Sequence, residues 1–284
     1  MATAVTMAFF AANSLLARLA LREGEIDGAS FTAFRIFAGA AALALLTSFR
    51  REGIGAARKN GSVRAALALF TYAITFSFAY LSLNAGTGAL ILFAAVQITM
   101  LGVGILSGDR PRPPEWIGLA VAFGGLVYLV SPGLTAPSPV GVSLMAFSGI
   151  AWGCYSLAAK GVRSPIAATA GNFVRATPMA AGTLLLIWEL GHPHASWSGL
   201  ALAATSGALT SGLGYSIWYL ALKDLGTSRA AIVQLSVPVL AAAAGVVLLG
   251  EQLTLRLVLA SVAILGGVTL ALLGKTRVAS PIPE

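Results

Sequence analysis

Ten apolar runs, each close to the length of a membrane-spanning helix, divide this sequence of 284 residues and set its fold class. About 20 apolar residues in a helix cross the roughly 30 Å hydrocarbon core of a bilayer. Charged residues make up only 10% of the chain. We therefore predict an all-α integral membrane protein. Its ten transmembrane helices are expected at about 2–21, 29–49, 64–84, 87–107, 115–131, 139–160, 166–189, 198–222, 227–249 and 254–274.

Lysine and arginine lie mainly on one side of these predicted helices. With a cytoplasmic N-terminus, thirteen of the eighteen fall on the cytoplasmic side, and only Arg18, Arg22 and Arg256 fall on the outer side. Cytoplasmic loops of membrane proteins carry such an excess. We therefore predict a multi-pass protein of the plasma (inner) membrane with both termini in the cytoplasm. The basic excess then indicates orientation in the lipid bilayer, and no nucleic-acid partner is expected.

The two halves of the chain resemble each other. A shift of 142 residues, half the chain, places Arg18 on Lys160 and Asp109 on Glu251. Each copy holds five helices, an odd number, so the second copy must cross the membrane in the opposite sense. We predict a five-helix repeat over residues 1–138 and an inverted copy over residues 139–284, forming one integral unit. Secondary transporters often have this architecture, with the substrate near the midplane.

Three sequence features then point to a known family. Trp152-Gly153 precedes Lys160, Arg175 lies early in the following helix, and LSVPVLAAAAGVVLLGEQLT (235–254) precedes a Gly-Gly helix. These features resemble the EamA-type members of the drug/metabolite transporter superfamily, over essentially the whole chain and most strongly in its second half. The resemblance implies ten helices in an inverted five-plus-five repeat and the export of small metabolites. We favour the branch of YddG-type amino-acid exporters with an aromatic preference.

The first half departs from that family pattern. Val96 occupies the position equivalent to Pro238, and Phe10-Ala11 stand where the Trp-Gly pair would be. In a helix over 227–251, Pro238 lacks an N–H and would leave the carbonyl of Gln234 unpaired. Unpaired backbone groups at mid-membrane must face protein or a water-filled cavity. Pro238 is therefore predicted to be a one-sided hinge in a helix that lines a cavity.

Acidic residues fall in loops or at helix ends, and none lies in the middle of a predicted span. Carriers that couple to protons or cations commonly use an intramembrane carboxylate. Its absence predicts transport of net-neutral solutes without a carboxylate relay. The sequence also lacks a phosphate-binding loop and a catalytic or metal-ligand constellation within the helices, so we expect no enzyme activity, no cofactor and no metal site.

Arg35 and Arg175 are the charges that lie well inside predicted helices. Each could anchor a carboxylate of the substrate. Each could instead bond to backbone carbonyls of the packed repeat, and this structural interpretation is the one that we favour. For Arg175 the carbonyl of Val174, freed by Pro178, is a nearby acceptor.

Aromatic and uncharged polar residues mark the predicted cavity. Tyr72, Phe76 and Tyr80 share one helix face, as residues four apart do, and a similar stripe occurs on the eighth helix. Neutral amides and hydroxyls can hold an amino-acid backbone, and aromatic rings can stack on its side chain or ammonium. Interhelical hydrogen bonding is the alternative for each residue, and an interfacial aromatic belt is a further one for Tyr80 and Tyr219. The candidate cavity residues are Asn13, Tyr72, Phe76, Tyr80, Gln97, Trp152, Tyr155, Tyr215, Trp218, Tyr219 and Gln234.

The sequence thus predicts a secondary-type exporter of small net-neutral metabolites, in particular amino acids including aromatic ones, that works by alternating access. Two alternatives stay open. One is a carrier of another metabolite class, such as nucleotide-sugars or drugs. The other is a lipid-handling or scaffold membrane protein, which packed and dry polar stripes would favour.

Overall fold

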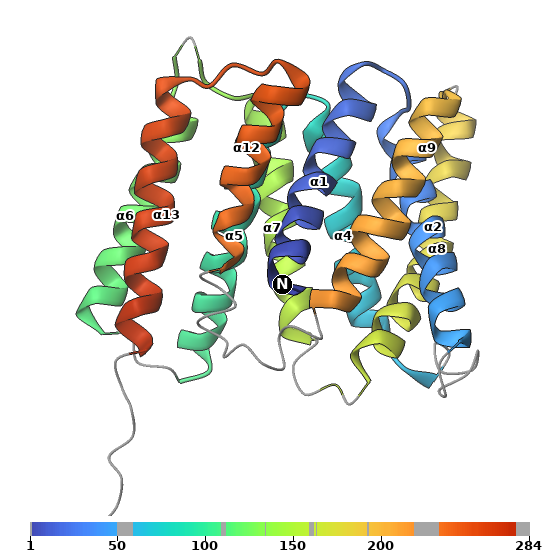
Figure 1. The fold of residues 1–284 in the computed structure, drawn as a ribbon, viewed down its shortest axis with the longest axis horizontal. Coiled ribbons are helices and arrows are strands. Elements are labelled where there is room, and N and C mark those ends of the chain that lie inside the picture. The colour runs from blue at the N-terminus through green and yellow to red at the C-terminus, as the bar shows by residue number, and fades with distance from the viewer. Residues whose placement is uncertain are drawn as a thin grey trace, which may run out of the picture.

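The computed structural model describes residues 2–49, 59–108, 112–133, 135–158, 162, 164–191, 193–218 and 233–276. Within these ranges the protein is helical, and its one β-bridge joins Ile26 to Ala195. α9 runs directly into η1, so the named elements form ten helical spans (Figure 1). The elements are α1 (Ala2–Arg22), α2 (Gly28–Ser48), α4 (Val63–Tyr80), α5 (Ala85–Leu106), α6 (Pro113–Val130), α7 (Pro139–Ala158), α8 (Pro165–Leu190), α9 (Trp197–Thr205), η1 (Ser206–Leu213), α12 (Ser236–Leu249) and α13 (Leu255–Thr276).

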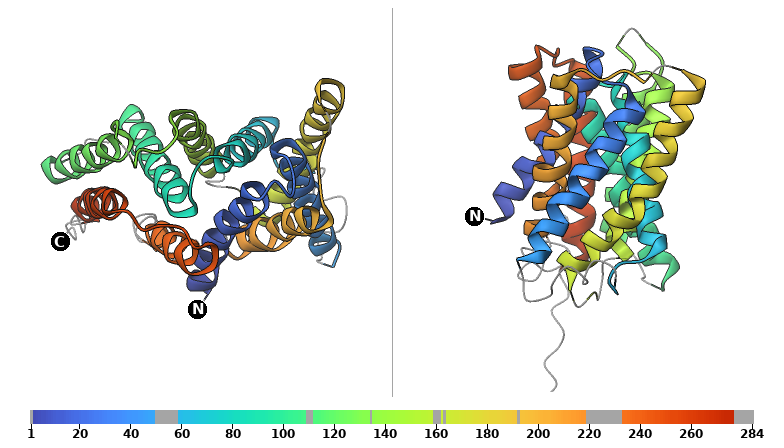
Figure 2. Two further views of the ribbon diagram at one scale, coloured as in Figure 1. Left: turned by 90° about the horizontal axis from the view of Figure 1, so that it is seen from above. Right: turned by 90° about the vertical axis from the view of Figure 1, so that its right-hand side faces the viewer.

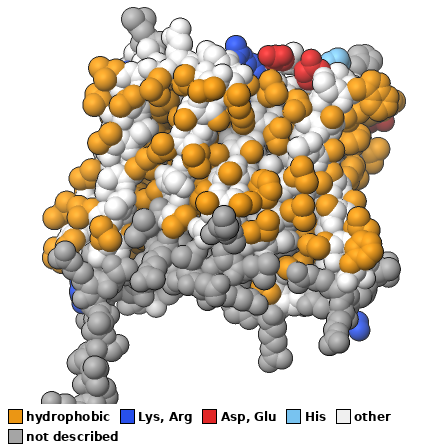
Figure 3. Space-filling model, in the orientation of Figure 1, with side chains coloured by type: hydrophobic (Ala, Val, Ile, Leu, Met, Phe, Trp, Pro, Cys, Tyr) orange, Lys and Arg blue, Asp and Glu red, His pale blue; other side chains and the backbone are white. Residues whose placement is uncertain are grey.

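The described residues confirm an all-helical fold with helices suited to a membrane. Among the described helices, eight are long and apolar enough to cross a membrane. Hydrophobic side chains cover the middle of the surface in Figure 3, and charged side chains lie toward its two ends. Exposed tryptophans occur near both ends, Trp188 and Trp197 at one and Trp116 at the other. Tryptophan prefers the membrane–water interface, so these rings mark the two edges of the apolar band.

α6 and α13 stand at one end of the molecule, and α2, α8 and α9 stand at the other (Figures 1 and 2). The helix contacts come in sets that relate the two halves of the chain. α6 contacts α13, α5 contacts α12, and α2 contacts α8. α4 packs on α7 as η1 packs on α1, and α5 packs on α7 as α12 packs on α1. These contacts therefore join elements that hold matching positions in the two halves of the chain.

Glycines permit the closest helix contacts. A Cβ atom built at Gly149 would overlap the carbonyl of Leu92, which brings α7 onto α5. A Cβ atom at Gly207 would overlap the carbonyl of Arg35, which brings η1 onto α2. Small residues at such positions let the backbones of membrane helices approach. In the Gly-Gly pairs of α6 and α13, only Gly125 and Gly267 make such contacts, whereas Gly124 and Gly266 face open space.

The Gly207→Ala variant should be destabilised by about 1–3 kcal/mol, because overpacking forces α2 and η1 apart. The expected measurement is thermal or denaturant unfolding in detergent. Gly266→Ala is the matched control, since no atom lies within 4 Å of its Cβ position. Alanine there should be neutral or stabilising by up to about 1 kcal/mol. Equal stability of the two variants would contradict the tight contact.

Three arginines at the predicted outer end cap the C-termini of other helices. Arg18 donates to the carbonyl of Tyr80 at the end of α4 over 2.9 Å. Arg22 donates to the carbonyl of Leu249 at the end of α12 over 2.7 Å, and Arg256 donates to Ser131 after α6. Cations favour helix C-termini because the last carbonyls lack partners there. These contacts account for the three basic residues that depart from the sequence-based charge bias.

The loops between α1 and α2 and between α8 and α9 are joined at the same end. Asp27 caps α2 through Ala29 and Ser30, and its other carboxylate oxygen accepts from the backbone N–H of His194. The Glu25 carboxylate accepts from the hydroxyls of Ser196 and Ser198 beside the start of α9, and these bonds lower its pKa.

The segment around Pro238 differs from its sequence-based description. The helical residues Val233 and Gln234 are followed by a turn at Leu235, and α12 begins at Ser236. Pro238 therefore lies in the first turn of α12, where a missing N–H leaves no intrahelical bond unmade. We expected a proline near the middle of a continuous helix. Its role as a hinge stays a prediction.

Candidate functional site

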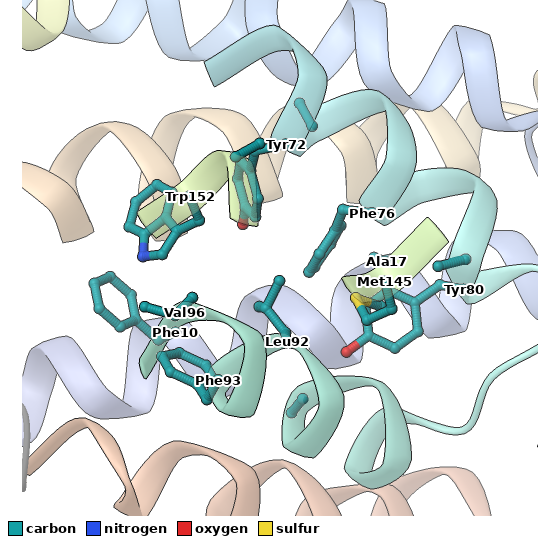
Figure 4. Packing of buried hydrophobic residues seen from close by; sticks show 14 of the residues in the cluster. Phe10, Ala17, Tyr72, Phe76, Tyr80, Leu92, Phe93, Val96, Met145 and Trp152 are labelled. Atoms are coloured by element: carbon teal, nitrogen blue, oxygen red, sulfur yellow. The ribbon is translucent and has the colours of Figure 1, made fainter. Parts of the chain in front are cut away.

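Five aromatic rings from four helical spans meet near the middle of the bundle. They are Phe10 from α1, Tyr72 and Phe76 from α4, Trp152 from α7, and Tyr215 just after η1. We call these five residues the aromatic cage. The centroid of the Trp152 ring lies 4.8 Å from that of Tyr72 and 4.8 Å from that of Tyr215. The Phe10 ring meets Trp152 edge-on at 6.2 Å (Figure 4).

Arg35 of α2 lies against this cage and is 2% exposed. Its Nη2 donates to the hydroxyl of Tyr72 over 2.9 Å and to that of Tyr215 over 3.5 Å, and its Nε donates to Ser211 over 3.3 Å. The guanidinium carbon stands 4.8 Å from the centroid of the Phe76 ring and 5.1 Å from that of Tyr72. Hydroxyls and ring faces therefore surround this cation.

Asn13 connects the cage to η1. Its amide nitrogen donates to the Tyr72 hydroxyl over 3.2 Å, and its amide oxygen accepts from Ser206 over 2.6 Å and from Thr210 over 3.1 Å. η1 is a π-helix of eight residues. Such stretches are rare and often occur at functional sites. Here it directs Ser206 and Thr210 toward Asn13, and Ser211 toward Arg35.

No described Asp or Glu forms an ion pair with Arg35, since the ion pair recorded for the described residues joins Arg18 to Glu251. Arg35 Nη1 is also buried without a hydrogen-bond partner in the part of the chain that the structure describes. An arginine at the centre of a membrane helix costs about 2.5–3.5 kcal/mol on insertion scales. Cation–π contacts offset about 0.5–2 kcal/mol of such a cost. Arg35 Nη1 therefore keeps hydrogen-bond donor capacity that no described residue uses.

The cage is closed in this structure. The cavity beside it has a volume of about 20 Å³, room for about one water molecule. A much larger cavity of about 420 Å³ opens at the predicted outer end. Its lining includes Arg18 and Glu251, whereas Ser14, one turn before Arg18 on α1, lines the small central cavity. The Arg18–Glu251 ion pair thus lies in the wall of the outer cavity, and Arg18 is one turn of α1 away from the central cavity.

The structure brings together part of the predicted cavity set. Asn13, Tyr72, Phe76, Trp152 and Tyr215 line the central cavity. Tyr155 and Trp218 pack at its edge, with ring centroids 5.4 Å from Trp152 and 5.8 Å from Phe10 respectively.

The other predicted residues lie elsewhere. Tyr80 sits beside Met145 at the far end of the cluster in Figure 4, and its hydroxyl donates to the carbonyl of Ala85. Gln97 and Gln234 are buried but line none of the three recorded cavities of the described residues. Tyr219 lies outside the described residues.

Arg175 bonds to backbone carbonyls, as the structural interpretation expected. Its Nη1 donates to Asn60 over 2.6 Å and to Gly171 over 3.0 Å. These acceptors differ from the Val174 carbonyl that the sequence suggests. Arg35, by contrast, bonds to side-chain hydroxyls at the cage, and the two arginines are not equivalent in this structure.

The chain is similar to several known proteins. The EamA-like transporter family matches residues 139–273. An uncharacterized protein of Pseudomonas aeruginosa is 51% identical over 95% of this chain and 93% of its own length. The chain belongs to the EamA-like transporter family. This agrees with the resemblance found in the sequence.

Two further proteins are similar to this chain. The threonine/homoserine exporter RhtA of Escherichia coli is 30% identical over 69% of this chain and 65% of its own length. A protein crystal structure matches with a TM-score of 0.68 and 21% identity, covering 98% of this chain and 99% of the other. The structural match shows the fold alone. The family description and the name of RhtA both identify transporters, whereas the Pseudomonas relative is uncharacterized.

Sequence reasoning missed several contacts in this EamA-like protein. Ser206 and Thr210 were not selected, although their spacing of four places both on one face of a helix. Arg18 and Glu251 were matched only to their repeat counterparts, Lys160 and Asp109, which lie outside the described residues. Alignment of two repeats shows which positions are equivalent, but it does not show which side chains touch.

Proposed function

We propose that this protein is a secondary-type exporter of small net-neutral metabolites, in particular amino acids including aromatic ones. The aromatic cage is the observation that carries the proposal. It combines ring faces with the amide of Asn13 and the tyrosine hydroxyls, which are groups that suit a small zwitterion with an apolar side chain. The transporter family and the exporter name of one relative support the same function.

We further propose that transport proceeds by alternating access between two inverted five-helix halves, residues 1–138 and 139–284. The matched helix contacts of the two halves support this arrangement. Both termini would be cytoplasmic in the inner membrane, as the lysine and arginine distribution favours. A closed cage with room for about one water molecule is what an occluded stage of such a cycle would present.

The proposed function needs no carboxylate in the middle of a span. Among the described residues, the buried acid Glu115 lies in the first turn of α6, and Glu251 follows the end of α12. Both carboxylates serve helix ends, because Glu115 accepts from the N–H of Arg112 and Glu251 accepts from that of Ala85.

Purified protein in liposomes tests the proposal directly. Labelled tryptophan, phenylalanine and threonine should enter faster than into empty liposomes, while a neutral sugar should not. Failure of all three amino acids would remove the amino-acid assignment. A steep dependence of their transport on an imposed pH gradient would contradict the absence of a carboxylate relay.

A lipid-handling or scaffold protein is the second candidate, because the small volume of the central cavity is also what a packed core would show. Single cysteines at Tyr72, Tyr215 and Gln234 separate the two functions. A transporter that cycles exposes at least the two cage positions to a polar thiol reagent. A permanently packed core leaves all three unlabelled in the folded protein.

A further inference from the structure

The hydroxyl of Tyr72 joins Arg35 to the aromatic cage by a hydrogen bond. Arg35 Nη2 and Asn13 Nδ2 both donate to this oxygen, over 2.9 and 3.2 Å. Neither nitrogen can accept a hydrogen bond, so both lone pairs of the Tyr72 oxygen are used. Its own proton is left for an acceptor. The Tyr215 oxygen lies 3.5 Å away, at the far limit of a hydrogen bond.

Donor capacity also remains on Arg35. Nη1 is buried and has no partner within the described ranges. No described carboxylate balances its charge, and the guanidinium lies over two aromatic rings instead. A buried cation favours an anion as its partner, because ring faces and neutral hydroxyls compensate its lost hydration only in part.

We propose that the cage recognises the carboxylate of its cargo through a hydrogen bond from Tyr72 that Arg35 strengthens, and that it does not require the cargo's ammonium group. This proposal rests on the proposed function and extends its substrate class from net-neutral amino acids to the matching monocarboxylate anions. The cargo would be a small molecule with one carboxylate, so that an α-amino acid and the matching 2-hydroxy acid both fit.

The surroundings of the cage explain why the carboxylate is the favoured end. The residues lining the central cavity are neutral, so an ammonium would find no anion there and would be repelled by Arg35. A carboxylate beside Tyr72 would instead receive a charge-assisted hydrogen bond in a medium of low dielectric constant. Arg35 acts through Tyr72 and is therefore a positioning residue. The rings must separate to admit the cargo, since the cavity now holds about one water molecule.

Competition with labelled phenylalanine in proteoliposomes tests the proposal. Phenyllactate replaces the ammonium by a hydroxyl, and phenylalaninol replaces the carboxylate by a hydroxymethyl group. Phenyllactate should compete within about threefold of unlabelled phenylalanine. Phenylalaninol should be about 10- to 100-fold weaker, the loss expected when a hydrogen bond to a charged group is missing.

The Tyr72→Phe variant keeps the ring and removes the hydroxyl. It should weaken phenylalanine and phenyllactate about 10-fold or more and leave phenylalaninol unchanged, so that the discrimination is lost. Arg35→Lys keeps a positive charge. It should therefore keep more of the preference for phenylalanine over phenylalaninol than Arg35→Gln does. Tyr80→Phe is the matched control, because Tyr80 is a buried tyrosine on the same helix whose hydroxyl bonds to a carbonyl outside the cage. A merely structural role of Tyr72 would change the transport rate but not the ratio between the analogues.

The outcomes separate the two proposals. If phenylalanine enters and phenylalaninol competes equally well, the carboxylate inference is wrong and the amino-acid function stands. If Tyr72→Phe still distinguishes phenylalanine from phenylalaninol as the unaltered protein does, another group binds the carboxylate and the inference is again wrong. If no amino acid enters, the proposed function fails and the inference fails with it. The analogue series on the unaltered protein keeps the test decisive even where a variant does not fold.

Discussion

Replacing Glu251 by glutamine should open the outer end of the bundle. The Glu251 carboxylate bonds to Arg18 Nε over 3.2 Å and accepts from the N–H of Ala85 at the start of α5 through both oxygens. Asn84, the N-cap residue of α5, makes no hydrogen bond with its side chain to the start of the helix. The Glu251 carboxylate accepts a backbone N–H there instead. Arg18 in turn holds the end of α4. The pair therefore ties α1, α4 and α5 to the residue that follows α12.

The expected loss is about 1.5–3 kcal/mol, the range for a hydrogen bond to a charged group. The side chains of Arg18 and Glu251 are 11% and 6% exposed, so solvent screens the pair only in part. If the pair exists only while the outer end is closed, its loss shifts the population toward the open state by about 10- to 100-fold.

A cysteine at Ser14 reports this opening, because Ser14 is buried and lines the central cavity. The background should carry Cys154→Ala, since Cys154 is exposed. Glu251→Gln should raise the rate of labelling by an impermeant thiol reagent from the outer side by about tenfold or more. Arg22→Gln is the matched control, because it removes an arginine from the same cavity without breaking an ion pair. An unchanged labelling rate in Glu251→Gln would contradict the closure assigned to the pair.

The helices were predictable because a membrane leaves the backbone no alternative. Every N–H and C=O in a span must bond within its own helix, so an apolar run of sufficient length fixes both the type and the approximate ends of an element. The run from Pro165 to Leu190 forms a helix despite its internal Pro178, as the sequence predicted. The start of α12 was less predictable, because Pro238 is compatible with a kink inside a helix and with the first turn of one.

The site was predictable only as a set of side chains. Spacing by four places Tyr72 and Phe76 on one face of α4, and both line the central cavity together with the predicted residues Asn13 and Trp152. The spacing of apolar residues does not reveal that η1 is a π-helix. This π-helical geometry determines which hydroxyls face Asn13. The partners of Arg35 likewise depend on helices that are distant in sequence, so the residues alone left its role open.

Replacing Trp152 by alanine should have the largest effect on transport, because its indole contacts four other rings. The centroids of Phe10, Tyr72, Tyr155 and Tyr215 lie within 6.2 Å of it. Truncation of a buried tryptophan costs about 3–5 kcal/mol of stability. It would also leave the cage without its central ring, so uptake of labelled phenylalanine should fall about 100-fold or more, as expected when misplaced groups no longer hold the bound geometry.

Two further variants show how much of the lost uptake in Trp152→Ala comes from lost stability and how much from the lost ring. Trp152→Phe keeps a ring and should retain stability within about 1.5 kcal/mol. Its phenylalanine uptake should fall less than that of Trp152→Ala. Trp188→Ala is the control, because Trp188 is 71% exposed and distant from the cage. It should keep uptake near the level of the unaltered protein. Normal uptake in Trp152→Ala would show that cargo crosses without meeting the cage, and the transport path would then have to lie between other helices.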